Sequence, residues 1–131
     1  MGQHSDVWQV YVDSSLMGSG QFDKAAILSY DLSGVEASSP GFEISPEELK
    51  HLAGAFANPD VPFQEGVFLN QEKFVAILAN DRSIYAKKGK EGVVIVKAKS
   101  CVIFVHHPET VQTPNAAVTV EGVADYINQY S

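Results

Sequence analysis

Four aromatic side chains near the two ends of the chain have the types and spacing of a ligand-binding surface. Trp8, the only tryptophan, lies three residues before Tyr11, which places both rings on one face of a helix. Tyr126 and Tyr130 are one turn of a second helix apart. Indole N–H and phenol O–H groups suit a polyproline II ligand, whose carbonyls have no internal donors. If the two helices lie side by side, the four rings come together on one surface. The alternative is that Trp8 and Tyr11 pack in the core, which the helical periodicity alone favours.

A basic segment is the second feature that could bind a partner. The formal net charge is −7, and residues 1–80 hold 3 basic and 11 acidic side chains. Residues 81–131 hold 6 basic and 5 acidic side chains, and all six basic ones lie between Arg82 and Lys99. The whole molecule should repel nucleic acid, whereas this segment suits an acidic partner. The alternative is that these side chains are ordinary solvated residues on strand faces.

Groups that could catalyse a reaction or ligate a metal are sparse in the sequence. His106 and His107 are the only histidine pair, and adjacent strand residues point to opposite faces, so they are poorly placed to share one ion. We interpret them as surface or rim histidines. Gly89-Lys90 lacks the hydroxyl residue that follows the lysine of a phosphate-binding loop. The sequence predicts no enzyme, metal or cofactor, although a site assembled from distant residues would leave no local motif.

The single cysteine and the lengths of the apolar runs indicate in which cellular compartment the protein is expected. Cys101 has no partner for an intramolecular disulfide, which favours a reducing environment, and its apolar neighbours predict a buried, inert thiol. The longest apolar run, residues 101–105, is far shorter than the span of about 20 residues that crosses a membrane. Residues 1–6 match neither a signal peptide nor a myristoylation motif. We expect a cytoplasmic protein, and its 131 residues fit one domain.

Three segments carry helix signals. The first spans about residues 6–16 and ends at a Gly-Ser-Gly sequence. The second begins at residues 45–48, where serine can cap the helix, proline suits the first turn and glutamate completes a capping box. Its apolar residues recur at helical spacing until about residue 58. The last helix spans about residues 115–130.

The rest of the chain carries strand signals separated by short turns. Breaks this short cannot contain helical crossovers, so the later strands should form an antiparallel meander. The class is therefore α+β, with helices packed on the faces of one sheet. The expected strands are residues 22–30, 66–69, 73–79, 83–87, 93–97 and 101–106.

Several segments together resemble the profilin family, and they match it in order along nearly the whole chain. The first reads WQVYVD, and the later ones read KAAIL, DRSIYAKKG and VADYI; they are residues 8–13, 24–28, 81–89 and 123–127. The resemblance implies a single profilin-like domain over residues 1–131. It implies a central seven-stranded, mostly antiparallel sheet, with the N- and C-terminal helices on one face and a shorter helix on the other.

The resemblance also implies two partners and a cytoskeletal role. Profilins bind monomeric actin and proline-rich segments to regulate filament assembly, and many bind phosphatidylinositol bisphosphate. The polyproline-binding positions carried over are Trp8, Tyr11, Tyr126, Ile127 and, near the family's terminal aromatic, Tyr130. The actin-binding positions are Lys87 and Lys88, which match the family's basic turn, and, by alignment, Phe63, Lys97, Asn115, Val118 and Glu121.

The chain departs from the family pattern at two points. Profilins usually carry a second tryptophan on the proline-binding surface, but the matching segment here reads Val-Glu-Ala at residues 35–37. The missing ring should cost about 1–3 kcal/mol, or roughly 10- to 100-fold in affinity. An asparagine common at the start of the last helix aligns with Ala117 or Val118, with Asn115 as its possible substitute. A proline-binding adaptor without useful actin affinity, and a small enzyme or ligand-binding domain, therefore stay as alternatives.

Phosphoinositide binding depends on the basic turn. Lys87, Lys88 and Lys90 could each contribute about 1 kcal/mol of attraction to an anionic head group. The net charge of −7 opposes wider contact with an anionic membrane.

Overall fold

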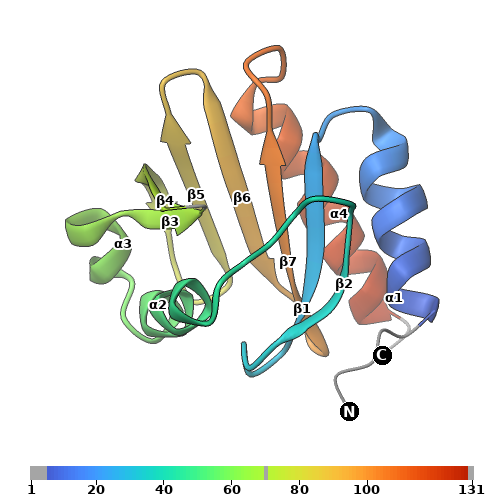
Figure 1. The fold of residues 1–131 in the computed structure, drawn as a ribbon, viewed down its shortest axis with the longest axis horizontal. Coiled ribbons are helices and arrows are strands. Elements are labelled where there is room, and N and C mark those ends of the chain that lie inside the picture. The colour runs from blue at the N-terminus through green and yellow to red at the C-terminus, as the bar shows by residue number, and fades with distance from the viewer. Residues whose placement is uncertain (1–5, 70, 130–131) are drawn as a thin grey trace.

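The computed structural model describes residues 6–69 and 71–129 (Figure 1). Along the chain the elements are α1 (Asp6–Val10), the π-helical turn η1 (Tyr11–Leu16), the 3₁₀ turn η2 (Met17–Ser19), β1 (Lys24–Ser29), β2 (Val35–Ser38), α2 (Pro46–Ala57), α3 (Asp60–Glu65), β3 (Val67–Leu69), β4 (Glu72–Ala79), β5 (Ser83–Lys88), β6 (Glu91–Lys97), β7 (Cys101–His107) and α4 (Thr113–Gln129). Within these two ranges, no helix is long and apolar enough to cross a membrane.

The strands form one seven-stranded antiparallel sheet in the order β2-β1-β7-β6-β5-β4-β3. From β3 to β7 each strand pairs with the next along the chain, because only short turns separate them. β1 pairs with β7 on one side and with β2 on the other, so β2 forms one edge of the sheet. The expected meander and the expected seven-stranded sheet are both confirmed.

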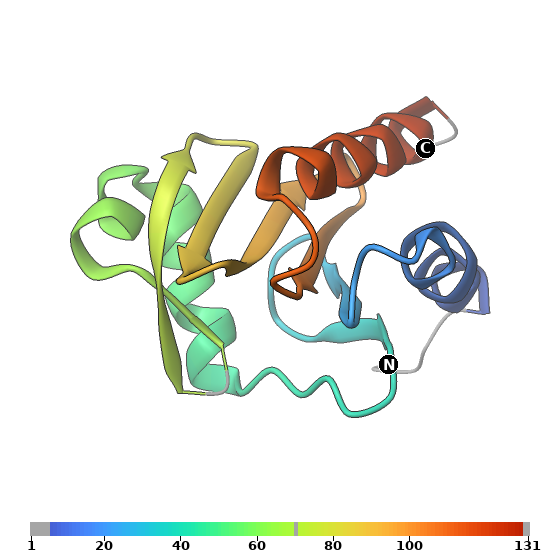
Figure 2. The ribbon, with the colours of Figure 1, turned by 90° about the horizontal axis from the view of Figure 1, so that it is seen from above.

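The helical segments from the two ends of the chain cover one face of the sheet. Figure 2 shows α1 and α4 next to each other, away from α2 and α3. Alternate residues of β6 divide between the faces, so Val94 and Val96 pack towards α4 whereas Val93 and Ile95 point to the opposite side. The core beneath the terminal helices contains Val12, Leu16, Ile27, Val94, Val96, Ile103, Val105, Ala116, Val120, Ala124 and Ile127.

The opposite face of the sheet is covered by α2. Its N-terminus has the predicted capping box, in which the Glu48 amide donates to the Ser45 hydroxyl and the Ser45 amide donates to the Glu48 carboxylate, both at 3.1 Å. Phe42, in the segment leading to α2, packs edge-on against Phe104 of β7, with ring centroids 5.7 Å apart. The other core residues on this face include Leu28, Leu49, Leu52, Phe56, Phe74, Ile84 and Ile95.

The structure adds two elements to those predicted and alters a third. β2 was missed because four residues, two of them polar, give too short a pattern to recognise. α3 was missed because it has only six residues and contains Pro62. The first helix is α-helical only to Val10 and continues as η1 and η2, until Gly20 adopts a left-handed φ of 78°.

Candidate ligand-binding surfaces

Three rings from the two ends of the chain meet where α1 and η1 lie beside α4. The Trp8 and Tyr11 ring centroids are 5.8 Å apart, and those of Tyr11 and Tyr126 are 6.2 Å apart with a 65° angle between the rings. Trp8 and Tyr11 are partly buried, and Tyr126 is 52% exposed. These three residues are called the aromatic surface below. Because no ring is fully buried, each keeps some surface that a ligand could contact.

A shallow pocket of about 490 Å³ continues the aromatic surface along α1. Val7 and Val10 line it together with Tyr11, Ser15 and Tyr126, and both valines are largely exposed. Sequence reasoning missed these two valines. Their spacing could have indicated them, since Val7 lies four residues before Tyr11 and three before Val10, and residues three or four apart on a helix are neighbours.

Other positions expected on the aromatic surface differ in environment. Ile127 is only 2% exposed and belongs to the core beneath the helices, so it supports the rings from below. Tyr130 lies outside the described residues. β2 provides no ring at Glu36; instead, the Gln9 side chain on α1 donates to the Ser38 carbonyl at 3.1 Å and joins the two elements.

A second candidate surface lies on β4 and β5, beyond the part of the sheet that α4 covers. α4 packs mainly on β6 and β7. Val75 and Ile77 alternate with buried residues of β4 and remain 61% and 53% exposed. Val75 is the cross-strand partner of Lys87 on β5, so these two side chains share a face. Val75, Ile77 and Lys87 are called the β4 surface below.

The predicted actin-binding residues are distributed unevenly around this surface. Phe63 is exposed on α3, which packs against β4, and Val118 and Asn115 are exposed on α4. Val75 and Ile77 could not be identified from the sequence, because a run of apolar residues does not show which face of a strand is covered. The exposed alternation on β4 is visible only once the helices are placed.

The lysines do not all lie at one end of the sheet. Lys88 forms an ion pair with Glu72 at 2.9 Å, and its hydrogen bond and charge lower the pKa of the Glu72 carboxyl. Lys97 ends β6 and pairs with Val102, whereas Lys88 pairs with Glu91 at the start of β6. Lys97 thus lies at the opposite end, where its ammonium is 4.9 Å from the Tyr30 ring centroid and 5.4 Å from that of Phe56. The structure does not bring Lys97 together with Lys87 and Lys88.

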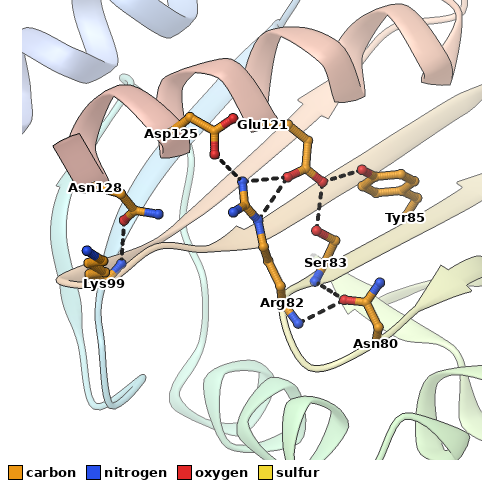
Figure 3. Close-up of polar contacts among 8 residues, drawn as sticks. All are labelled: Asn80, Arg82, Ser83, Tyr85, Lys99, Glu121, Asp125 and Asn128. Atoms are coloured by element: carbon orange, nitrogen blue, oxygen red, sulfur yellow. Dashed lines mark hydrogen bonds and ion pairs between the residues drawn. The ribbon is translucent and has the colours of Figure 1, made fainter.

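Glu121 of α4 is held in a polar cluster on β5 (Figure 3). Its carboxylate accepts hydrogen bonds from Ser83 Oγ at 2.7 Å, from Arg82 Nε at 3.1 Å and from the Tyr85 hydroxyl. Arg82 also donates to Asp125 at 2.9 Å. Burial, together with the Glu121 hydrogen bond and charge, raises the pKa of Tyr85 to about 12. These five residues are called the latch below, because they tie α4 to β5.

His106 and His107 are both buried, so the prediction that they are surface or rim histidines was wrong. His106 Nδ1 lies 2.6 Å from Asp23 and its Nε2 lies 2.9 Å from Glu91. His107 faces the other side of the sheet, where its ring bonds the Thr113 hydroxyl at 2.9 Å. Both rings have hydrogen-bond partners, which makes their burial tolerable. The partners of His106 are 15 and 83 residues away, so they could not be read from the local pattern.

Other candidate reactive groups have structural environments. Within residues 6–69 and 71–129, no group of three or more His, Cys, Asp or Glu side chains could hold a metal ion. Cys101 is buried as predicted, and burial, with a smaller effect of the Glu36 charge, raises the pKa of its thiol to about 12. A thiol with so high a pKa is a poor nucleophile at neutral pH.

Known proteins resemble this chain over nearly its full length. The family model described as Profilin matches residues 6–131. A profilin of Schizosaccharomyces pombe is 44% identical over 120 residues, which cover 92% of this chain and 94% of that protein. Profilin-1B of Acanthamoeba castellanii is 42% identical over 120 residues, with the same coverage.

Solved structures give the same result. The crystallised Schizosaccharomyces pombe profilin superposes with a TM-score of 0.92 at 43% identity, covering 95% of this chain and 98% of that one. Mouse profilin IIa, solved in complex with a double repeat from the FH1 domain of mDia1, superposes with a TM-score of 0.77 at 26% identity, covering 94% and 97%. The chain therefore belongs to the profilin family.

Proposed function

We propose that this chain binds monomeric actin and proline-rich segments, and that it regulates actin filament assembly through both. The observation that carries the proposal is the aromatic surface, which three rings form at the junction of the terminal helices. The β4 surface is built from different elements, so the two partners need not compete. In this proposal the chain is a single-domain, non-catalytic member of its family that acts in the cytoplasm, at the cytoskeleton.

The proline-rich ligand would lie across Trp8, Tyr11 and Tyr126. Pyrrolidine rings pack on flat aromatic faces, while ring-edge N–H and O–H groups can donate to ligand carbonyls. The solved complex of mouse profilin IIa with an FH1 double repeat supports a ligand of this class, since the two chains share a fold. Glu36 in place of a further ring should make this binding weaker than on a surface with four rings.

The actin monomer would contact the β4 surface and its neighbours. Neighbouring exposed apolar side chains on a strand are typical of a protein interface rather than of an ordinary solvent-facing strand. Val75, Ile77 and Phe63 supply the apolar part, and Lys87 and Lys88 supply the positive charge. Asn115 and Val118 extend the surface onto α4.

A proline-binding adaptor with weakened actin affinity is the second candidate function. The engagement of Glu121 in the latch and the distance of Lys97 from the basic turn favour it, since neither residue is free for the β4 surface. Phosphoinositide binding at Lys87, Lys88 and Lys90 is a further proposal, in which the Lys88–Glu72 pair would first have to open.

Two titrations test the leading proposal. Proline decamer should change the fluorescence of Trp8, which reports the site without interference because it is the only tryptophan. A molar excess of the chain should slow polymerisation of pyrene-labelled actin. A fluorescence response without an effect on actin would favour the adaptor, and no response in either experiment would refute both functions.

The basic turn is tested by charge reversal. Lys88→Glu should weaken actin binding and leave proline binding unchanged, while the charge-matched control Lys99→Glu, at an exposed position on the β6–β7 turn, should affect neither. Equal loss of actin binding in both variants would mean that overall charge, rather than this turn, is responsible.

A further inference from the structure

A groove of about 890 Å³ lies at the N-terminal end of α2. It is lined by the segment leading into α2, by the first turns of that helix and by residues at and after β3. None of the lining residues belongs to the aromatic surface, the β4 surface or the latch. The two proposed partners therefore leave this groove unexplained.

Contacts within the chain hold the apolar part of the groove in place. Phe68 of β3 meets the His51 ring of α2 edge-on, with centroids 5.0 Å apart and an interplanar angle of 88°. The Gln71 amide donates to Glu48 Oε2 at 3.0 Å, which ties the β3–β4 turn to α2. Ile44 adds a partly buried aliphatic side chain. Because contacts within the chain fix its walls, a ligand would not have to order them.

The charge of the groove is negative and only partly compensated. Glu48 is engaged, since its two oxygens accept from the Ser45 and Gln71 amides. The side chains of Glu43 and Glu47 are exposed and make no hydrogen bond or ion pair with any residue that the structure describes. Glu47 interacts favourably with the start of α2, but Glu43 precedes the helix and lacks that role. The lining contains no lysine or arginine.

We propose that this groove binds a basic, extended segment of a partner protein through an arginine side chain. The guanidinium would lie near the Phe68 ring and between the free carboxylates of Glu43 and Glu47, and an adjacent aliphatic residue would contact Ile44. Charge complementarity selects this occupant, because the carboxylates repel phosphate-bearing ligands and residues 1–80 are strongly acidic. The proposal is independent of actin and proline binding.

Amide chemical shifts of the ¹⁵N-labelled full chain test this proposal. The probe is the peptide acetyl-Gly-Arg-Leu-Arg-Gly-amide, and the matched peptide has glutamine in place of each arginine. Saturable shifts are expected at the amides of Glu43, Ile44, Ser45, Glu47, Glu48 and Phe68, with no change at Trp8 or Tyr11. Equal responses to both peptides, or shifts that map elsewhere, would overturn the proposal.

A pair of charge-matched variants separates the groove from general acidity. The Glu43→Gln/Glu47→Gln variant should weaken binding of the arginine peptide at least fivefold. The Asp81→Asn/Glu109→Gln variant removes the same charge at exposed positions outside the groove and should change it less than twofold. Equal weakening in the two variants would overturn the proposal, and matching urea midpoints would establish that both are folded.

Discussion

At the residue scale, the environment of each aromatic ring decides whether it can bind a ligand. Tyr126 is half exposed and touches Tyr11, whereas its neighbour Ile127 is buried in the core. Two adjacent positions on α4 thus have different environments, one open to solvent and one buried under the helix. A substitution at Tyr126 should therefore affect binding more than folding.

Replacing Tyr126 with alanine should weaken proline decamer binding about 5- to 30-fold. The reason is the loss of a ring that contributes about 1–2 kcal/mol of apolar contact. Val118→Ala, at another exposed position of α4, is the control and should leave this affinity unchanged. The Trp8 fluorescence titration measures both variants, and equal affinities would remove Tyr126 from the aromatic surface.

The buried thiol of Cys101 should make stability depend on pH in alkaline solution. Its pKa is raised from 9.0 to about 12 by burial, so between these values the unfolded state loses its proton first. Stability is therefore complete below pH 9 and falls as the pH rises towards 12, by about 1 kcal/mol at pH 10. Urea unfolding at pH 8 and pH 10 should show this loss, and Cys101→Ala should reduce it. An unchanged pH dependence in the variant would contradict the assignment.

At the element scale, the latch explains how α4 keeps its position on the sheet. Arg82 ends a tight turn and Ser83 begins β5, and the Asn80 side chain accepts from the amides of both. Their side chains then reach Glu121 in the middle of α4. Since α4 carries Tyr126 near one end and Val118 near the other, the latch fixes parts of both proposed binding regions relative to the sheet.

Within the latch, Glu121→Gln should destabilise the protein by about 1 kcal/mol, while Asp125→Asn should cost less than about 0.5 kcal/mol. Glu121 is 27% exposed and accepts from three side chains, whereas Asp125 is 69% exposed and pairs only with Arg82 among the described residues. The midpoint of urea unfolding measures both. A larger loss for Asp125→Asn would contradict this ranking.

Elements with strong local signals could be predicted from the sequence, and those defined by packing could not. The capping box at Ser45 and the short turns of the meander are local, so α2 and the later strands were predicted close to their actual bounds. The burial of His106 depends on Asp23, which is 83 residues away. The exposure of Val75 and Ile77 depends on where α4 ends its coverage of the sheet.

At the scale of the whole molecule, the candidate surfaces lie at different places around the sheet. The aromatic surface lies at the junction of α1 and α4, and the β4 surface lies across the sheet towards its other edge. The acidic groove is formed at α2, on the face opposite the terminal helices. This arrangement would let one small protein hold different partners at the same time.

The central claim is that proline-rich segments and actin monomers occupy separate surfaces. Sedimentation velocity of actin monomer with this chain, in the absence and presence of saturating proline decamer, measures it directly. If the surfaces are separate, the decamer binds the complex and leaves the fraction of bound actin unchanged. Displacement of the chain from actin by the decamer would contradict it, because both ligands would then share one surface.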